Sequence, residues 1–190
     1  MSQKTFIIAA DTSGSMSENS KDLLLRHLCE YVLQRSRYTQ DLQEYQLQFL
    51  SWAQSTQPVY PQENGRIPLP SPSGRRQEQA LISYVQQAGI NRSSGARILL
   101  LTDEAVPPES DLQLFLKENG LPAVQIIVGA ETPAFKPHYG HLSIWPAEDI
   151  GTAVTELLIQ SLLPMSLPGN LEELMSTTCS LTAEDEEDEW

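Results

Sequence analysis

Strand-length apolar runs alternate along the chain with segments of helical periodicity. Phe6 to Ala10 and Ile98 to Leu101 contain only apolar residues. Asp11 directly follows the first run, and Asp103 follows the second after one intervening residue. Uninterrupted apolar runs of this length are typical of strands buried on both faces of a parallel sheet. Val124 to Val128 is predicted to be a third buried strand, and Leu142 to Trp145 a short last one.

Apolar residues also recur at intervals of three and four in several segments, which predicts helices between these strands. The helices are expected from Ser17 or Asn19 (as the cap) to Tyr38, from Ala80 to Ala88, from Ser110 to Gly120, and after Pro146. Alternating strands and helices indicate an α/β fold, a doubly wound and mostly parallel sheet of the Rossmann-like kind.

One strand is expected to run against the others. Tyr45 to Ala53 alternates apolar and polar residues in its first half, and Pro58 to Leu69 contains a further extended stretch broken by Asn64-Gly65. We interpret the two as an antiparallel pair at one edge of the sheet. The 190 residues suit one domain, residues 1–164, followed by a linker and an acidic, flexible tail, residues 165–190.

Residues 184–189 at the end of the chain are all acidic and account for six charges of the net −13, which leaves −7 for the rest. A moderately acidic body argues against nucleic acid, whose phosphates are bound by clustered Lys and Arg. The two cysteines, Cys29 and Cys179, lie far apart and are interpreted as reduced thiols. No segment has the length of a signal-peptide core or a membrane span, so we expect a cytoplasmic protein without membrane contact.

A pattern of oxygen-bearing side chains follows the first strand. Asp11, Ser13 and Ser15 alternate as D-x-S-x-S, and Gly14 permits a tight turn between them. Ligand sites of open parallel sheets form where strands end, so Asp103 after the second apolar run should lie nearby. Oxygen ligands of mixed charge suit a hard cation such as Mg²⁺ or Mn²⁺.

These residues resemble a known family. FIIAADTSGSM, residues 6–16, is similar to the first strand and metal-ion-dependent adhesion site (MIDAS) motif of von Willebrand factor type A (VWA) domains, and LLLTD, residues 99–103, is similar to their fourth strand and third metal loop. Trp52 on the second strand and the helix after Trp145 keep the family's order, so the resemblance covers roughly residues 4–164. Small intracellular bacterial VWA proteins of the tellurite-resistance-associated type look most similar.

The resemblance implies that Asp11, Ser13, Ser15 and Asp103 hold the metal directly or through water. The family's second loop normally supplies a Thr, and an ungapped alignment places Arg75 there. Ser73, or Ser71 nearby, would supply the missing hydroxyl if the loop shifts, whereas a cationic Arg75 would weaken metal binding. In the family, a carboxylate from a partner protein completes the metal's coordination.

The predicted function is therefore that of an intracellular, metal-dependent interaction adaptor rather than an enzyme. Its partner would offer an Asp or Glu, and could be a MoxR-type ATPase or a Ser/Thr kinase or phosphatase in a stress or signalling system. Two alternatives stay open: a metal-independent VWA scaffold subunit, and a metal-dependent phosphoesterase that uses Asp11, Asp103 and Glu104. The sequence offers no glycine-rich phosphate loop and no G-x-S-x-G nucleophile motif.

Overall fold

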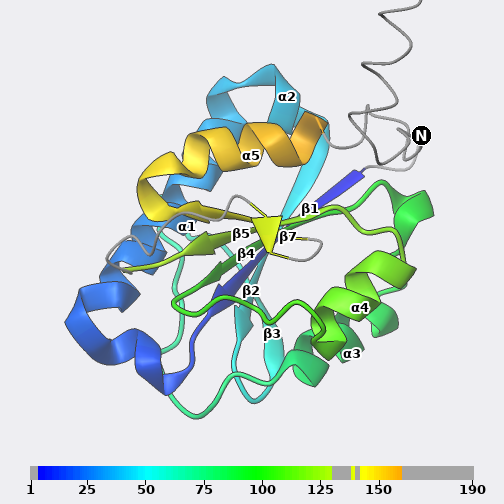
Figure 1. The fold of residues 1–190 in the computed structure, drawn as a ribbon. Coiled ribbons are helices and arrows are strands. Elements are labelled where there is room, and N and C mark those ends of the chain that lie inside the picture. The colour runs from blue at the N-terminus through cyan, green and yellow to red at the C-terminus, as the bar shows by residue number, and fades with distance from the viewer. Residues whose placement is uncertain (1–3, 130–137, 140–141, 160–190) are drawn as a thin grey trace, which may run out of the picture.

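The computed structural model describes residues 4–129, 138–139 and 142–159, and the tail predicted for residues 165–190 lies outside them (Figure 1). Their centre is a seven-stranded sheet with the order β3-β2-β1-β4-β5-β7-β6. The strands are β1 (Lys4–Asp11), β2 (Tyr45–Trp52), β3 (Thr56–Val59), β4 (Arg97–Thr102), β5 (Ala123–Ile127), β6 (His138–Tyr139) and β7 (Leu142–Pro146). The five inner strands pair in parallel, whereas β3 and β6 pair antiparallel at opposite edges. The predicted α/β class is confirmed, with a second antiparallel edge strand added.

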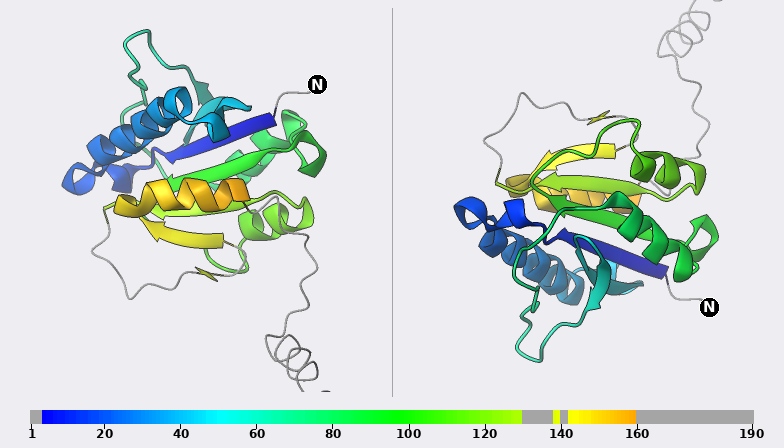
Figure 2. Two further views of the ribbon diagram at one scale, coloured as in Figure 1. Left: turned by 90° about the horizontal axis from the view of Figure 1, so that it is seen from above. Right: turned by 90° about the horizontal axis from the view of Figure 1, so that it is seen from below.

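Helices cover both faces of the sheet, as the views from above and below show (Figure 2). One face carries α1, α2 and α5, and the other carries α3 and α4 (Figure 1). The helices are α1 (Lys21–Tyr38), α2 (Gln40–Gln43), α3 (Glu78–Gln87), α4 (Asp111–Glu118) and α5 (Ile150–Ile159), with 3₁₀ turns η1 (Gly14–Ser20), η2 (Arg92–Ser94) and η3 (Ala147–Asp149). The helical segments expected from the sequence are all present.

The central strand β1 shows why its sequence is apolar throughout. Phe6, Ile8 and Ala10 belong to the core beneath α1 and α5, while Ile7 and Ala9 belong to the core beneath α3 and α4. All five side chains are completely buried. Because successive residues of a strand face opposite sides, a strand with helices on both sides cannot alternate between apolar and polar positions.

The antiparallel edge pair is tighter than the sequence suggested. The chain reverses directly after β2, where the amide of Ala53 donates to the carbonyl of Ser55 over 3.1 Å. Pro58 lies in β3, which an edge strand tolerates because it need not donate on its outer side. The Asn64-Gly65 turn therefore lies in the loop beyond β3 rather than within the strand pair.

The cap predicted for the first helix is wrong. The helix starts at Lys21, and Ser20 precedes it without a side-chain capping bond. The hydroxyl of Ser17 donates instead to the carbonyl of Gly14 over 2.7 Å. Asn19 and Ser20 both have positive φ angles, 51° and 60°. Left-handed backbone at residues other than Gly costs about 1–3 kcal/mol each, so some other contact must hold this turn in place.

The thiol of Cys29 is completely buried in the core beneath α1, and it is a free cysteine. Burial raises the pKa of this thiol far above its usual range. We expect a Cys179→Ser variant to react with a thiol reagent at a rate at least about 10³-fold below that of the urea-unfolded chain, because labelling requires core opening. Fast labelling of the folded variant would contradict the burial of Cys29.

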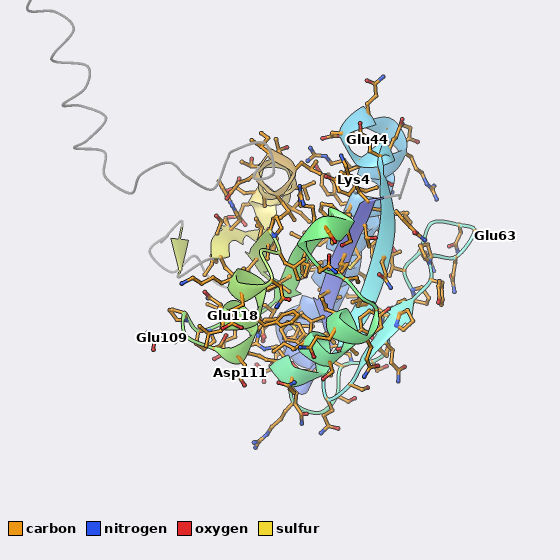
Figure 3. All side chains as sticks on the ribbon, turned by 90° about the vertical axis from the view of Figure 1, so that its right-hand side faces the viewer. Lys4, Glu44, Glu63, Glu109, Asp111 and Glu118 are labelled. Carbon is orange, nitrogen blue, oxygen red and sulfur yellow. The ribbon has the colours of Figure 1, made fainter. Side chains whose placement is uncertain are left out.

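The start of β1 lies at the far end of the sheet from Asp11. Lys4 pairs there with Glu44 over 3.1 Å, and both side chains are well exposed (Figure 3). Among the described residues, no helix is long and apolar enough to cross a membrane. Asp11 and Asp103 lie at the opposite edge, where β1 and β4 end.

Candidate metal centre

Asp11 is the innermost group of the site, with a side chain only 1% exposed. Its Oδ1 accepts a hydrogen bond from the backbone amide of Ser13 over 2.8 Å, which closes the tight turn that the D-x-S-x-S pattern predicts. Its Oδ2 accepts from the hydroxyl of Thr102 at the end of β4, over 2.7 Å. The loop after β1 and the neighbouring parallel strand β4 thus each fix one carboxylate oxygen.

The predicted oxygen ligands form a chain of contacts from the buried to the exposed side of this edge. The hydroxyls of Ser13 and Ser15 are 3.3 Å apart, and Ser15 donates to Oδ1 of Asp103 over 3.2 Å. Ser13 is buried and Ser15 is exposed. The structure therefore gathers Asp11, Ser13, Ser15 and Asp103 at one point that faces solvent.

The second loop is held against the first by backbone hydrogen bonds. Gly14 donates to the carbonyl of Gly74 over 2.9 Å, and Ser73 donates to the carbonyl of Thr12 over 2.8 Å. A β-carbon on Gly14 would lie 3.3 Å from the Gly74 oxygen, so this close approach favours glycine. Ser73 is exposed and its side chain does not line the site's pocket, so its role as a metal ligand stays a prediction.

The cation that enters the site is Arg76 rather than Arg75. Nη1 of Arg76 lies 3.5 Å from Oδ2 of Asp11, donates to the carbonyl of Glu104 over 3.0 Å, and contacts the Thr102 hydroxyl. Its guanidinium lies over the ring of Trp52, 5.5 Å from the centroid, and its side chain is 13% exposed. Arg75 lines the pocket but is exposed.

A second internal cation neutralises the other carboxylate. Nζ of Lys21 lies 2.8 Å from Oδ2 of Asp103, and the two side chains are 14% and 9% exposed. The strained turn at Asn19 and Ser20 directly precedes Lys21. The stem of Lys21 packs over Gly129, where an added β-carbon would come within 2.8 Å of its Cγ. The strained backbone at Asn19 and Ser20 and the close packing over Gly129 thus both help to place the Lys21 ammonium group beside Asp103.

The pocket at this edge has a volume of about 320 Å³. It is lined by Asp11, Ser13, Ser15, Gly74, Arg75, Arg76, Asp103 and Glu104. The three carboxylates of this lining are balanced by its two arginines together with Lys21 behind Asp103. The local formal charge of this lining together with Lys21 is therefore close to zero.

The donor types fit a hard cation, because Asp11, Ser13, Ser15 and Asp103 offer only oxygen atoms. Among the described residues, no group of three or more His, Cys, Asp or Glu gathers as a metal site, so two hydroxyls would have to complete the set. A dication about 5 Å from a guanidinium would be repelled by about 7 kcal/mol at an effective dielectric constant of about 20. Arg76 in this position would therefore weaken the binding of an ion beside Asp11.

Sequence reasoning missed three residues that contact the carboxylates of the site: Thr102, Arg76 and Lys21. Thr102 precedes Asp103, and the register of β1 against β4 could have placed its hydroxyl beside Asp11. Arg76 neighbours the suspected Arg75, but only the path of the loop decides which of the two points inward. Lys21 carries no signal in the sequence, since its position depends on the left-handed turn before it.

No protein-family model matches this sequence, and no curated protein matches it. Solved structures do match. Proximal thread matrix protein 1 (PTMP1) from the mussel byssus matches with a TM-score of 0.55 and 15% identity over 84% of this chain and 47% of that chain. Manganese-loaded TRAP protein of Plasmodium vivax matches with a TM-score of 0.53 and 16% identity over 83% and 74%.

A further PTMP1 structure, with a zinc-occupied MIDAS motif, matches with a TM-score of 0.52 and 12% identity over 84% of this chain and 48% of that chain. The chain thus spans about half the length of the PTMP1 structures. Identities this low establish the architecture alone. Together with the strand order and the two helical layers, these matches show that the chain has a VWA-like fold.

Proposed function

We propose that this chain is a protein-interaction module that binds an Asp or Glu side chain of a partner through a Mg²⁺ or Mn²⁺ ion. Asp11, Ser13, Ser15 and Asp103 would hold the ion, which would supply the positive charge for the partner's carboxylate. The main observation in support is that the side-chain oxygens of Ser13, Ser15 and Asp103 are linked by hydrogen bonds at an exposed edge of the sheet.

Two further observations support this function. The pocket opens where β1 and β4 end, which is the edge at which open α/β sheets place their ligands. The similar solved structures include a manganese-loaded protein and one whose MIDAS motif holds zinc. A cytoplasmic adaptor role beside a MoxR-type ATPase or a Ser/Thr kinase or phosphatase is the finer form of the proposal.

A metal-independent scaffold is the second candidate, and the two internal ion pairs favour it. Arg76 beside Asp11 and Lys21 beside Asp103 already supply positive charge where the metal would. In that case the same edge would bind its partner without any ion. The two candidates therefore differ in their response to chelator.

Partner capture from the source cells separates these candidates. With immobilised protein, we expect a partner to be retained in millimolar Mg²⁺ and lost with chelator. A Ser13→Ala/Ser15→Ala variant removes two neutral ligands without changing the charge, so it should lose the partner in Mg²⁺ as well. Retention of the partner that is unaffected by both the chelator and this double substitution would favour the scaffold.

A separate assay tests the phosphoesterase alternative. Metal-dependent turnover of a generic phosphoester, abolished by the Ser13→Ala/Ser15→Ala variant, would favour the phosphoesterase.

A further inference from the structure

We propose that Arg76 and Lys21 are built-in counter-ions of this centre, so that a divalent ion binds only by competing with them. The proposal rests on the metal-dependent function above and adds its control. In this structure, each carboxylate of the D-x-S-x-S and LLLTD loops has its own internal cation. The two carboxylates are therefore neutralised by the chain itself until an ion displaces these partners.

Arg76 is held by several contacts besides its ion pair with Asp11. The carbonyl of Glu104 accepts from its Nη1 over 3.0 Å, and its Nη2 lies 3.6 Å from the Glu104 carboxylate. The Trp52 ring lies beneath the guanidinium. An arginine that only screened surface charge would not be fixed at its carbonyl, carboxylate and aromatic contacts at once. This arrangement makes Arg76 a fitted occupant of the site.

Lys21 reaches the site by an independent route, from the first residue of α1. Two consecutive left-handed residues turn the chain immediately before it, and the absence of a side chain at Gly129 leaves room for its stem. Strained backbone of this kind clusters at binding and switch regions. Two unrelated segments, the second loop and the start of α1, thus each deliver one cation to one carboxylate.

The two cations leave part of the donor set free. Arg76 lies beside Oδ2 of Asp11 and Lys21 beside Oδ2 of Asp103, while the hydroxyls of Ser13 and Ser15 lie within hydrogen-bond distance of each other and Ser15 donates to Oδ1 of Asp103. An incoming ion can therefore meet the two serines and Oδ1 of Asp103 first. Release of Arg76 would then expose the remaining acidic oxygen of Asp11.

Mn²⁺ affinity, measured as the loss of the free-ion EPR signal on the full chain, tests the competition. Arg76→Gln is expected to bind Mn²⁺ at least about tenfold more tightly than the unmodified protein, and Lys21→Gln is expected to shift in the same direction. Arg75→Gln is the matched control, because it removes an equal charge from the pocket lining without breaking an ion pair, and should change affinity less than about threefold.

Three outcomes would overturn the proposal. Equal gains for Arg75→Gln and Arg76→Gln would mean that general charge, and not the ion pair, sets affinity. Equal affinity of the unmodified protein and Arg76→Gln would refute the competition while leaving metal-dependent function intact. If neither the unmodified protein nor any of these variants binds Mn²⁺ at about 10 mM of the ion, both the competition and the metal-dependent function are refuted.

A second readout follows Arg76 directly in the unmodified protein. The side-chain Nε–H resonance of Arg76, assigned by its absence in Arg76→Gln, should shift on saturation with diamagnetic Mg²⁺ because the guanidinium leaves Asp11 and Trp52. An unchanged resonance in protein that demonstrably binds Mg²⁺ would show that the ion binds with Arg76 in place.

Discussion

Asp11→Ala is expected to lower the free energy of unfolding by about 3–5 kcal/mol in metal-free buffer. Removing one member of a largely buried ion pair costs about this much, because the remaining charge loses its partner and stays desolvated. Here the substitution removes the buried partner of the Arg76 guanidinium and leaves it only the exposed Glu104 carboxylate, and it also removes the acceptor of the Ser13 amide and the Thr102 hydroxyl. Urea unfolding with chelator, followed by circular dichroism, measures the loss.

The matched control combines this substitution with Arg76→Gln. Part of the loss should be recovered, since the double variant contains no guanidinium that has lost its buried carboxylate, and a coupling free energy of about 1–3 kcal/mol is expected for a direct pair. If the two single effects simply add, Asp11 and Arg76 do not interact in solution. The internal counter-ion proposal would then lose its structural basis.

Trp52→Ala should be similarly destabilising, by about 3–5 kcal/mol, the usual cost of removing a large aromatic side chain from a core. The Trp52 side chain is completely buried at the end of β2. Its Nε1 donates to the carbonyl of Gln77 over 2.8 Å, directly before α3, and its ring lies beneath Arg76. The loss should therefore affect both the core and the second loop. Urea unfolding provides the measurement.

Trp52→Phe separates the two roles of this residue. It keeps much of the aromatic bulk but removes the hydrogen bond to Gln77, and should cost about 1–2 kcal/mol, clearly less than the alanine variant. A Trp52→Ala protein within about 1 kcal/mol of the unmodified one would contradict the placement of this ring in the core.

The architecture could be predicted because its signals are local and strong. The runs Phe6 to Ala10 and Ile98 to Leu101 are buried on both faces, and their ends fall at the same edge. That rule alone places Asp11 close to Asp103. The tight turn at Ser13 likewise follows from the alternation of side chains with Gly14, and the structure closes it with the expected carboxylate-to-amide bond.

The charge balance of the site could not be predicted in the same way. Whether Arg75 or Arg76 enters the pocket depends on the path of a loop held by Gly14 and Gly74, which are distant in the sequence. The role of Lys21 could not be predicted, because the expected cap at Ser17 or Asn19 would have started the helix earlier and directed the Lys21 side chain elsewhere. Sequence patterns identified the acidic and hydroxyl groups, whereas only tertiary structure revealed their counter-ions.

Crystals of the full chain equilibrated with millimolar Mn²⁺ test the central claim most directly, because the anomalous signal locates the ion without ambiguity. The metal-dependent account predicts one Mn²⁺ peak in contact with the hydroxyls of Ser13 and Ser15 and the carboxylate of Asp103, with Arg76 moved away from Asp11. A map without such a peak, in which Arg76 and Lys21 keep their carboxylate partners, would contradict that account and leave a module that binds its partner without metal.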